Sequence, residues 1–190
     1  MTDAVPLAVE ALQRAGVPMS PGLSDAELHA IERSWSFRFA EDHRRLLQVA
    51  LPVGPKWVDW RSAPRHELRE RLDAPIEGVL FDVGHNEFWA ASWGERPTSS
   101  HAALRRARRE VSLWPTLVPL YSHRYLAAWP AGPGGPVLSV HQTDVIHYGN
   151  DLVSYLHREG LAVGLDNWTA PLRPVPVWSQ LAQGFDGPDL

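Results

Sequence analysis

The chain has 190 residues, of which 44% are hydrophobic and 21% charged, a composition typical of a folded globular protein rather than a disordered one. Its formal net charge of −4 gives no general reason to expect nucleic acid as a partner, and the lack of cysteine excludes disulfides and thiolate metal ligands. No apolar run reaches the ~20 residues of a membrane span, and the first residues lack the basic start of a signal peptide, so we expect a cytoplasmic protein without membrane contact.

The first part of the chain predicts a series of helices. Apolar residues at helical spacing indicate a short amphipathic helix over residues 1–15. The stretch LSDAELHAIERSW then carries a capping box, because Ser24 precedes a helix and Glu27 stands three residues later. We expect a further helix that begins at Glu41 and another that covers residues 62–73.

The sequence after this point predicts a change from helix to extended chain and back. The stretch EGVLFDVGHNEFWAASWGERP, residues 77–97, predicts one or two short extended segments around a turn at residues 84–86. Residues 100–115 predict a helix with four arginines on its outer side. Those arginines either contact a phosphate or an acidic partner, or form a solvated helix face on an acidic protein.

The second half of the chain predicts a sheet. Four strands are expected, at Leu117–Tyr121, Tyr125–Trp129, Pro136–His141 and Val145–Tyr148. The last two should form a central hairpin buried on both faces, because they contain two near-continuous apolar runs made of Val137, Leu138, Val140, Val145 and Ile146. A final helix is expected between a cap at Asn150 and Gly160. This order predicts an α+β fold with a mostly antiparallel sheet, N-terminal helices and a helix after the last strand.

Ser139, His141 and Asp144 suggest the triad of a hydrolase. If residues 137–141 form a strand, Ser139 and His141 point to the same face, and Asp144 lies at the next turn. A triad also needs an exposed nucleophile beside an oxyanion hole, and the chain has no G-x-S-x-G turn that would supply one. We therefore interpret these residues as the polar side of a hairpin and predict no catalytic residue.

Three histidines, His123, His141 and His147, could converge on a metal ion from neighbouring strands. Their spacing matches no H-E-x-x-H or comparable ligand pattern. A histidine on a strand more often forms a hydrogen bond with a backbone carbonyl. We therefore expect no metal site and no cofactor.

Much of the chain resembles the SUKH superfamily, the bacterial relatives of the Smi/Knr cell-wall-assembly regulators. The segments that carry the resemblance occur in the family's order, and they are LSDAELHAIERSWSFRFAEDHRRLL, FWAASWGERP, LVPLYSHRYL and PVLSVHQTDVIHYGNDLVSYL. The resemblance implies an α+β fold with a central antiparallel sheet and no shared catalytic residues. It also implies that the protein is an immunity protein, which binds and neutralises a cognate toxin, or else a regulator.

The resemblance also predicts how the chain is divided into a domain and a tail. We expect one SUKH-like domain over residues 1–160, in which residues 1–20 are a helical extension. A tail over residues 161–190 contains prolines and two tryptophans, and we expect it to pack on the domain.

Charge and aromatic residues predict the partner-binding surface. From Asp73 to Glu95 the chain holds five acidic residues and neither lysine nor arginine. Nuclease toxins are basic because they hold phosphates, so we expect a basic toxin domain as the partner. The residues expected to contact it are Asp82, Glu87, Trp89, Trp93 and Glu95. The alternative functions are an intracellular regulatory or scaffolding domain with an endogenous protein partner and, third, a hydrolase.

Overall fold

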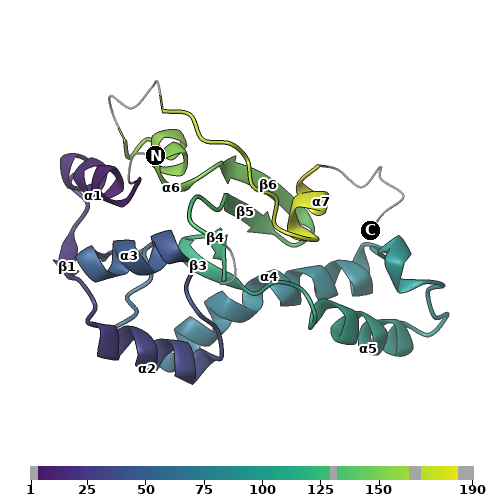
Figure 1. The fold of residues 1–190 in the computed structure, drawn as a ribbon. Helices are drawn as coiled ribbons and strands as arrows, with labels where there is room; N and C mark the ends of the chain where they lie inside the picture. Colours follow the sequence, from purple (N-terminus) through teal and green to yellow (C-terminus); the bar gives the residue numbers. More distant parts are fainter. Residues whose placement is uncertain (1–3, 129–131, 163–167, 184–190) are drawn as a thin grey trace.

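Helices from before and after the strands pack against a sheet formed in the second half of the chain (Figure 1). The structure, a computed structural model, describes residues 4–128, 132–162 and 168–183. Within them the fold is mixed α+β with antiparallel sheets, as predicted.

The first three helices begin close to where the sequence predicts them. They are α1 (Ala4–Arg14), α2 (Asp25–Trp35) and α3 (Glu41–Val49). The capping box of α2 is present, because Ser24 Oγ accepts a hydrogen bond from the Glu27 N–H and the Ser24 N–H donates to the Glu27 carboxylate at 2.8 Å. Two short strands, β1 (Met19–Pro21) and β2 (Ala50–Pro52), pair beside these helices.

The main sheet has four antiparallel strands in chain order, β3-β4-β5-β6. Their bounds lie near the predicted ones, and they are Leu117–Tyr121, Arg124–Ala127, Val137–His141 and Asp144–Gly149. Trp129, the predicted end of the second strand, lies outside the described residues. After the sheet comes α6 (Leu152–Arg158), whose cap is Asp151 rather than the predicted Asn150.

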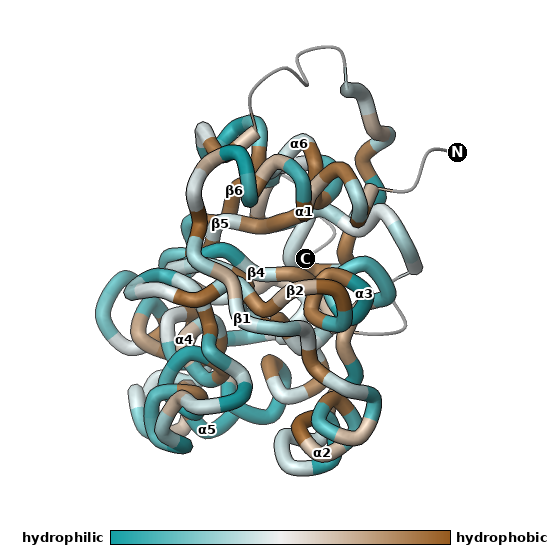
Figure 2. The backbone as a smooth tube through the Cα atoms, turned by 90° about the vertical axis from the view of Figure 1, so that its left-hand side faces the viewer, coloured by the Kyte–Doolittle hydropathy of each residue, from teal (hydrophilic) through white to brown (hydrophobic). Residues whose placement is uncertain are grey.

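The sheet is covered on both faces. Leu138 and Val140 of β5 pack with buried residues of helices α4 (Arg65–His85), α5 (Ser100–Val111) and α7 (Trp178–Ala182). On the other face, Leu126 and Val137 pack with buried residues of α1, α3 and α6. Figure 2 shows the hydrophobic residues of α1, α6 and the strands close together, whereas α5 is mostly hydrophilic. The prediction for the last hairpin is confirmed for β5. It is wrong for β6, which is an edge strand rather than a central one and whose Ile146 is 45% exposed although Val145 beside it is 4% exposed.

The tail contributes to the core through α7. Trp178 is fully buried, and its indole N–H donates to the carbonyl of Pro115 at 2.8 Å. Next to it, the hydroxyl of Ser179 forms a hydrogen bond with His147 Nε2 at 2.8 Å, which joins α7 to the edge strand β6. These residues fill a face of the sheet that would otherwise meet water.

Helix α4 is longer than the sequence predicts, and the expectation of extended segments over residues 77–97 is wrong. The helix continues to His85, and only a single 3-10 turn at Ala91–Trp93 separates it from α5. Gly78 of α4 lies against the β5–β6 turn. A Cβ atom there would come within 2.8 Å of the Gln142 Cα, so glycine allows the helix to contact the turn directly.

A tyrosine of the sheet compensates for the proline inside α4. In a regular helix the N–H of residue 75 donates to the carbonyl of Arg71, but Pro75 has no N–H. The hydroxyl of Tyr125 on β4 donates to this carbonyl instead, at 3.2 Å. Burial raises the pKa of Tyr125 to about 12, so its hydroxyl stays protonated and able to donate at neutral pH.

We predict that Tyr125→Phe lowers the free energy of unfolding by about 1 kcal/mol or more, because the Arg71 carbonyl loses its donor. In a Pro75→Ala background the same change should have a smaller effect, since the alanine N–H can donate to that carbonyl. Urea unfolding of the wild type, both single variants and the double variant measures this coupling. If the two substitutions changed the free energy of unfolding additively, Tyr125 would not be replacing the hydrogen bond that Pro75 cannot make.

The two strands of the last hairpin provide a second, matched prediction. Val140→Asp buries an unpaired carboxylate in an interior strand, where Val140 is 5% exposed, and should remove several kcal/mol of stability and with it soluble expression. Ile146→Asp places the same group on the half-exposed edge strand and should lower stability by only about 1 kcal/mol. Soluble yield and thermal unfolding distinguish the two variants, and a cooperatively folded Val140→Asp protein would show that this packing is wrong.

Candidate functional site

The connection between α4 and α5, residues 86–99, presents three of the five predicted partner-binding residues. Glu87 and Glu95 are exposed, and neither makes an ion pair with the described residues. Trp89 is half-buried, and its indole N–H donates to the carbonyl of Gly94 at 2.7 Å. Figure 1 shows this connection at the opposite end of the molecule from α1.

Asp82 is not part of this surface, which corrects its assignment as a partner-binding residue. It is 3% exposed and lies on the inner side of α4. Its carboxylate accepts hydrogen bonds from the Thr143 N–H at 2.9 Å, from the Thr143 hydroxyl at 2.6 Å and from the Asn86 side chain. Asp82 therefore fixes the end of α4 to the β5–β6 turn.

Trp93 is also buried, and its assignment to the partner-binding surface is corrected in the same way. It is 3% exposed and belongs to the core between α4, α5 and the sheet. Its ring lies within 6.0 Å of three other aromatic rings, those of Phe88, Trp89 and Trp114. Edge-on contacts between aromatic rings add stability to that gained from burying apolar area. Trp93 therefore helps to hold the ring of Trp89 in place.

Charges that are separated along the chain lie next to each other in the folded protein. Helices α4 and α5 pack side by side, so Arg108 of α5 pairs with Glu77 of α4 at 3.1 Å. Within α4, Arg69 lies 3.8 Å from Asp73. Two of the acidic residues between Asp73 and Glu95, namely Asp73 and Glu77, are therefore in ion pairs. The two at the α4–α5 connection, Glu87 and Glu95, make no ion pair with the described residues.

The residues of the suspected triad lie on the last hairpin of the sheet, where they contact residues other than one another or pair at the turn. Ser139 lies opposite Arg124 in the register of β4 and β5, and its hydroxyl accepts a hydrogen bond from the Arg124 guanidinium at 2.9 Å. Arg124 also lies 3.1 Å from a carboxylate oxygen of Glu159 and 3.7 Å from the ring centre of Tyr148. His141 is exposed and pairs in register with Asp144 at the turn. This geometry joins α6 to the sheet, as expected for polar residues that brace it.

Two of the three histidines considered as metal ligands have other contacts. His147 bonds Ser179, and His123 Nδ1 lies 3.2 Å from the hydroxyl of its neighbour Ser122. Across residues 4–128, 132–162 and 168–183, no group of three or more His, Asp or Glu side chains is placed to hold a metal ion.

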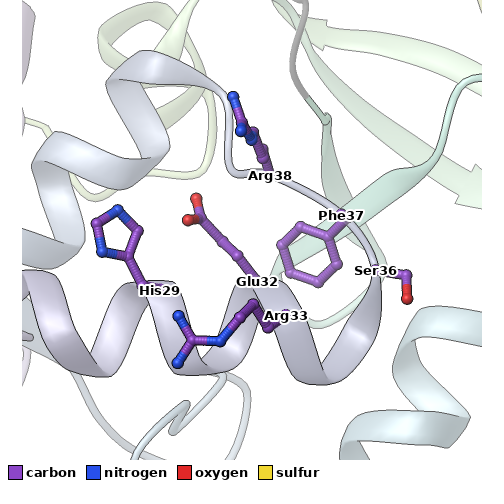
Figure 3. Close-up of a pocket in the computed structure, with 6 residues that line it drawn as sticks. All are labelled: His29, Glu32, Arg33, Ser36, Phe37 and Arg38. Atoms are coloured by element: carbon purple, nitrogen blue, oxygen red, sulfur yellow. The ribbon is translucent and has the colours of Figure 1, made fainter.

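A polar hollow at the end of α2 was not expected from the sequence. It has a volume of about 530 Å³, and Figure 3 shows the six residues that line it, His29, Glu32, Arg33, Ser36, Phe37 and Arg38. The sequence contains one signal for it, since His29 and Arg33 stand four residues apart on the polar side of a predicted helix. No sequence pattern predicts that the chain reverses after α2 and places Arg38 at the same hollow.

Comparisons of the chain with protein-family models, with curated proteins and with solved structures find no match. In the part of the chain that the structure describes, every helix is too short or too polar to cross a membrane.

One buried titratable group lies apart from these surfaces. His43 on α3 is 1% exposed, and both of its ring nitrogens lack a hydrogen-bond partner. Its ring packs edge-on against Phe39, with 5.0 Å between the ring centres. Burial lowers the pKa of His43 from 6.5 to about 3, so the folded protein holds this side chain in its neutral form.

We predict that His43 makes the protein less stable as the pH falls below 6.5. Below that pH the His43 side chain binds a proton in the unfolded chain, whereas in the folded protein it stays neutral down to about pH 3. His43→Leu should reduce this loss between neutral pH and about pH 5, and should raise stability at neutral pH by about 1 kcal/mol or more. His66→Leu, on the exposed side of α4, is the matched control and should leave the pH dependence unchanged. Urea unfolding at both pH values gives the free energies, and an equal pH dependence in wild type and His43→Leu would refute this role.

Proposed function

We propose that this protein is a cytoplasmic, non-enzymatic binding module of the SUKH type that acts as an immunity protein. In this proposal it neutralises a cognate toxin by covering the toxin's active surface. The resemblance over residues ~20–160 supports it, and so does the α+β fold with a central antiparallel sheet. The observation that carries the proposal is the α4–α5 connection, where Glu87 and Glu95, which make no ion pair with the described residues, flank the anchored Trp89 in the sequence.

The position of Trp89 suits it to be an anchor in an interface. Its indole N–H donates to the Gly94 carbonyl, its ring centre lies 5.1 Å from that of Trp93 in an edge-on arrangement, and Arg96 stands 5.9 Å from its ring centre. A ring that is already fixed loses little conformational freedom on binding, and tryptophan is enriched among the residues that dominate binding energy. The half-exposed Trp89 therefore offers apolar area that needs little reorganisation.

The two glutamates supply the charge that a basic partner would recognise. Glu87 follows the end of α4 with a φ of 59°, an uncommon conformation for a residue other than glycine, at the point where the chain leaves the helix. Glu95 follows Gly94, whose carbonyl holds the Trp89 indole. Exposed charges of this kind mainly raise the association rate and make it depend on salt.

The partner must first be identified, by a pull-down from native lysate with mass spectrometry. Association kinetics are then measured for Glu87→Lys/Glu95→Lys and for the control Glu67→Lys/Glu70→Lys, which makes the same charge change on exposed residues near the other end of α4. We expect the first pair to slow association at low salt by about tenfold and to weaken its salt dependence, because steering is lost. The control should stay within about twofold of wild type.

The outcomes separate the competing functions. An unchanged association rate for Glu87→Lys/Glu95→Lys, with folding intact, would place the interface elsewhere. A captured toxin domain that loses its activity on binding supports the immunity function. A signalling or cell-envelope protein as the partner would instead support the regulatory alternative.

A further inference from the structure

Helix α5 presents one side to its neighbours and the opposite side to solvent. Its buried residues, Ala103, Ala107 and Val111, follow one another at four-residue spacing on the side that packs beside α4. Arg105 and Arg109 each stand midway between two of these residues, and at 3.6 residues per turn they point away from the buried side. Both arginines are exposed, on a helix that lies at the periphery in Figure 1 and is mostly hydrophilic in Figure 2.

The four arginines of α5 differ in whether an acidic residue compensates their charge. Arg106 pairs with Glu110 of the same helix at 3.4 Å. Arg108 pairs with Glu77 of α4 at 3.1 Å. The other two, on the outer side, make no ion pair within the part of the chain that the structure describes. The fold therefore leaves two positive charges of this helix available to a partner.

Hydrogen bonds along the helix hold these two guanidinium groups in place without compensating their charge. Arg105 Nη1 donates to His101 Nδ1 at 2.5 Å, and Arg109 Nη1 donates to the carbonyl of Arg105 at 3.3 Å. Neither acceptor, an imidazole nitrogen and a backbone carbonyl, carries a negative charge. A guanidinium group has five N–H donors, so each keeps further donors for another molecule. Side chains that are already positioned lose less conformational freedom on binding.

An exposed leucine lies one further turn along the chain. Leu113 is 82% exposed, the highest value among the large hydrophobic residues of the described part. It stands four residues after Arg109 in the turn that continues α5, where its N–H donates to the carbonyl of Glu110 at 3.1 Å. A single exposed leucine is common on proteins, but this one extends a pair of uncompensated charges. We call Arg105, Arg109 and Leu113 the α5 face.

We infer that the α5 face binds an acidic amphipathic helix of a protein partner. Arg105 and Arg109 are about 6 Å apart along the helix axis, and a helix with carboxylates four residues apart presents them at the same spacing. Guanidinium groups match carboxylates with paired, charge-assisted hydrogen bonds. Leu113 then contacts an apolar residue one turn beyond the carboxylates.

A nucleic acid fits this surface less well than an acidic helix does. Proteins that bind nucleic acid neutralise several phosphates, whereas the α5 face has two uncompensated charges on a chain whose net charge is −4. The exposed leucine also adds nothing to a phosphate contact. The α5 face takes the opposite charge from the α4–α5 connection, and its test needs no toxin, so it stands or fails independently of the proposed function.

The probe for this test is a fluorescent, alanine-based helical peptide of about 20 residues, with glutamates four residues apart and a leucine one turn beyond them. Fluorescence anisotropy at low ionic strength measures its binding to the full chain, and we expect saturation. Arg105→Glu/Arg109→Glu should weaken binding by about tenfold or more and should bind the matching lysine peptide instead. Leu113→Ser should weaken binding of the glutamate peptide by about threefold, because the apolar contact is lost.

The matched control is Arg33→Glu/Arg158→Glu, which makes the same charge change on exposed arginines of α2 and α6 that have no ion pair with the described residues. It should keep the affinity for the glutamate peptide within about twofold of wild type. Thermal unfolding checks that each variant folds. If the charge-reversed α5 variant does not fold, Arg105→Gln/Arg109→Gln removes the charge without reversing it and should also weaken binding.

Four results would overturn the inference. The first is the absence of saturable binding of the glutamate peptide. The second is equal binding of a peptide with glutamine in place of glutamate, which would show that charge is not recognised. The third is equal weakening in the α5 variant and the control, which would assign the effect to the net charge of the protein. The fourth is binding of labelled oligouridine, lost in the α5 variant, where the peptide does not bind, which would indicate a nucleic acid.

Discussion

The four-stranded sheet has apolar side chains on both of its faces, so it can exist in water only between two layers of helices. Leu138 and Val140 require cover from α4, α5 and α7, whereas Val137 and Leu126 require it from α1, α3 and α6. The helices on either side come from both ends of the chain. The end of the α4–α5 pair, where we propose the partner contact, is among the parts that this covering leaves outside.

Those elements that depend on neighbouring residues in the sequence could be predicted. The capping box at Ser24 and Glu27 is such a local signal, and the apolar runs of the second half placed the strands within a few residues. Helix α4 was missed beyond residue 73 because Pro75 and Gly84 resemble chain breakers. The acceptance of Pro75 depends on a distant residue, since Tyr125 replaces the lost helical donor. Gly84 lies where α4 meets α5, and a Cβ atom there would stand 3.7 Å from Leu104 Cδ2.

The candidate site was predicted less completely, for the same physical reason. The sequence shows that Asp82 and Trp93 belong to an acidic, aromatic segment, but a correct helix assignment is needed to see that both face inward. The bond between Asp82 and Thr143 joins residues 61 positions apart, which no local pattern reveals. The charge pattern was misleading in a similar way, because Arg108 folds back beside Glu77. Glu87, Trp89 and Glu95 lie at a chain reversal between two helices and stay accessible.

The order in which the ribosome makes the chain gives α7 a particular importance. All four strands of the sheet leave the ribosome before Trp178 does, and translation adds about 5–20 residues per second. During that interval Val145 and the other side chains that later pack with α7 remain in contact with water. The nascent protein therefore passes through a stage in which its sheet is accessible to chaperones and to other unfinished chains, and this stage ends only when its last helix docks.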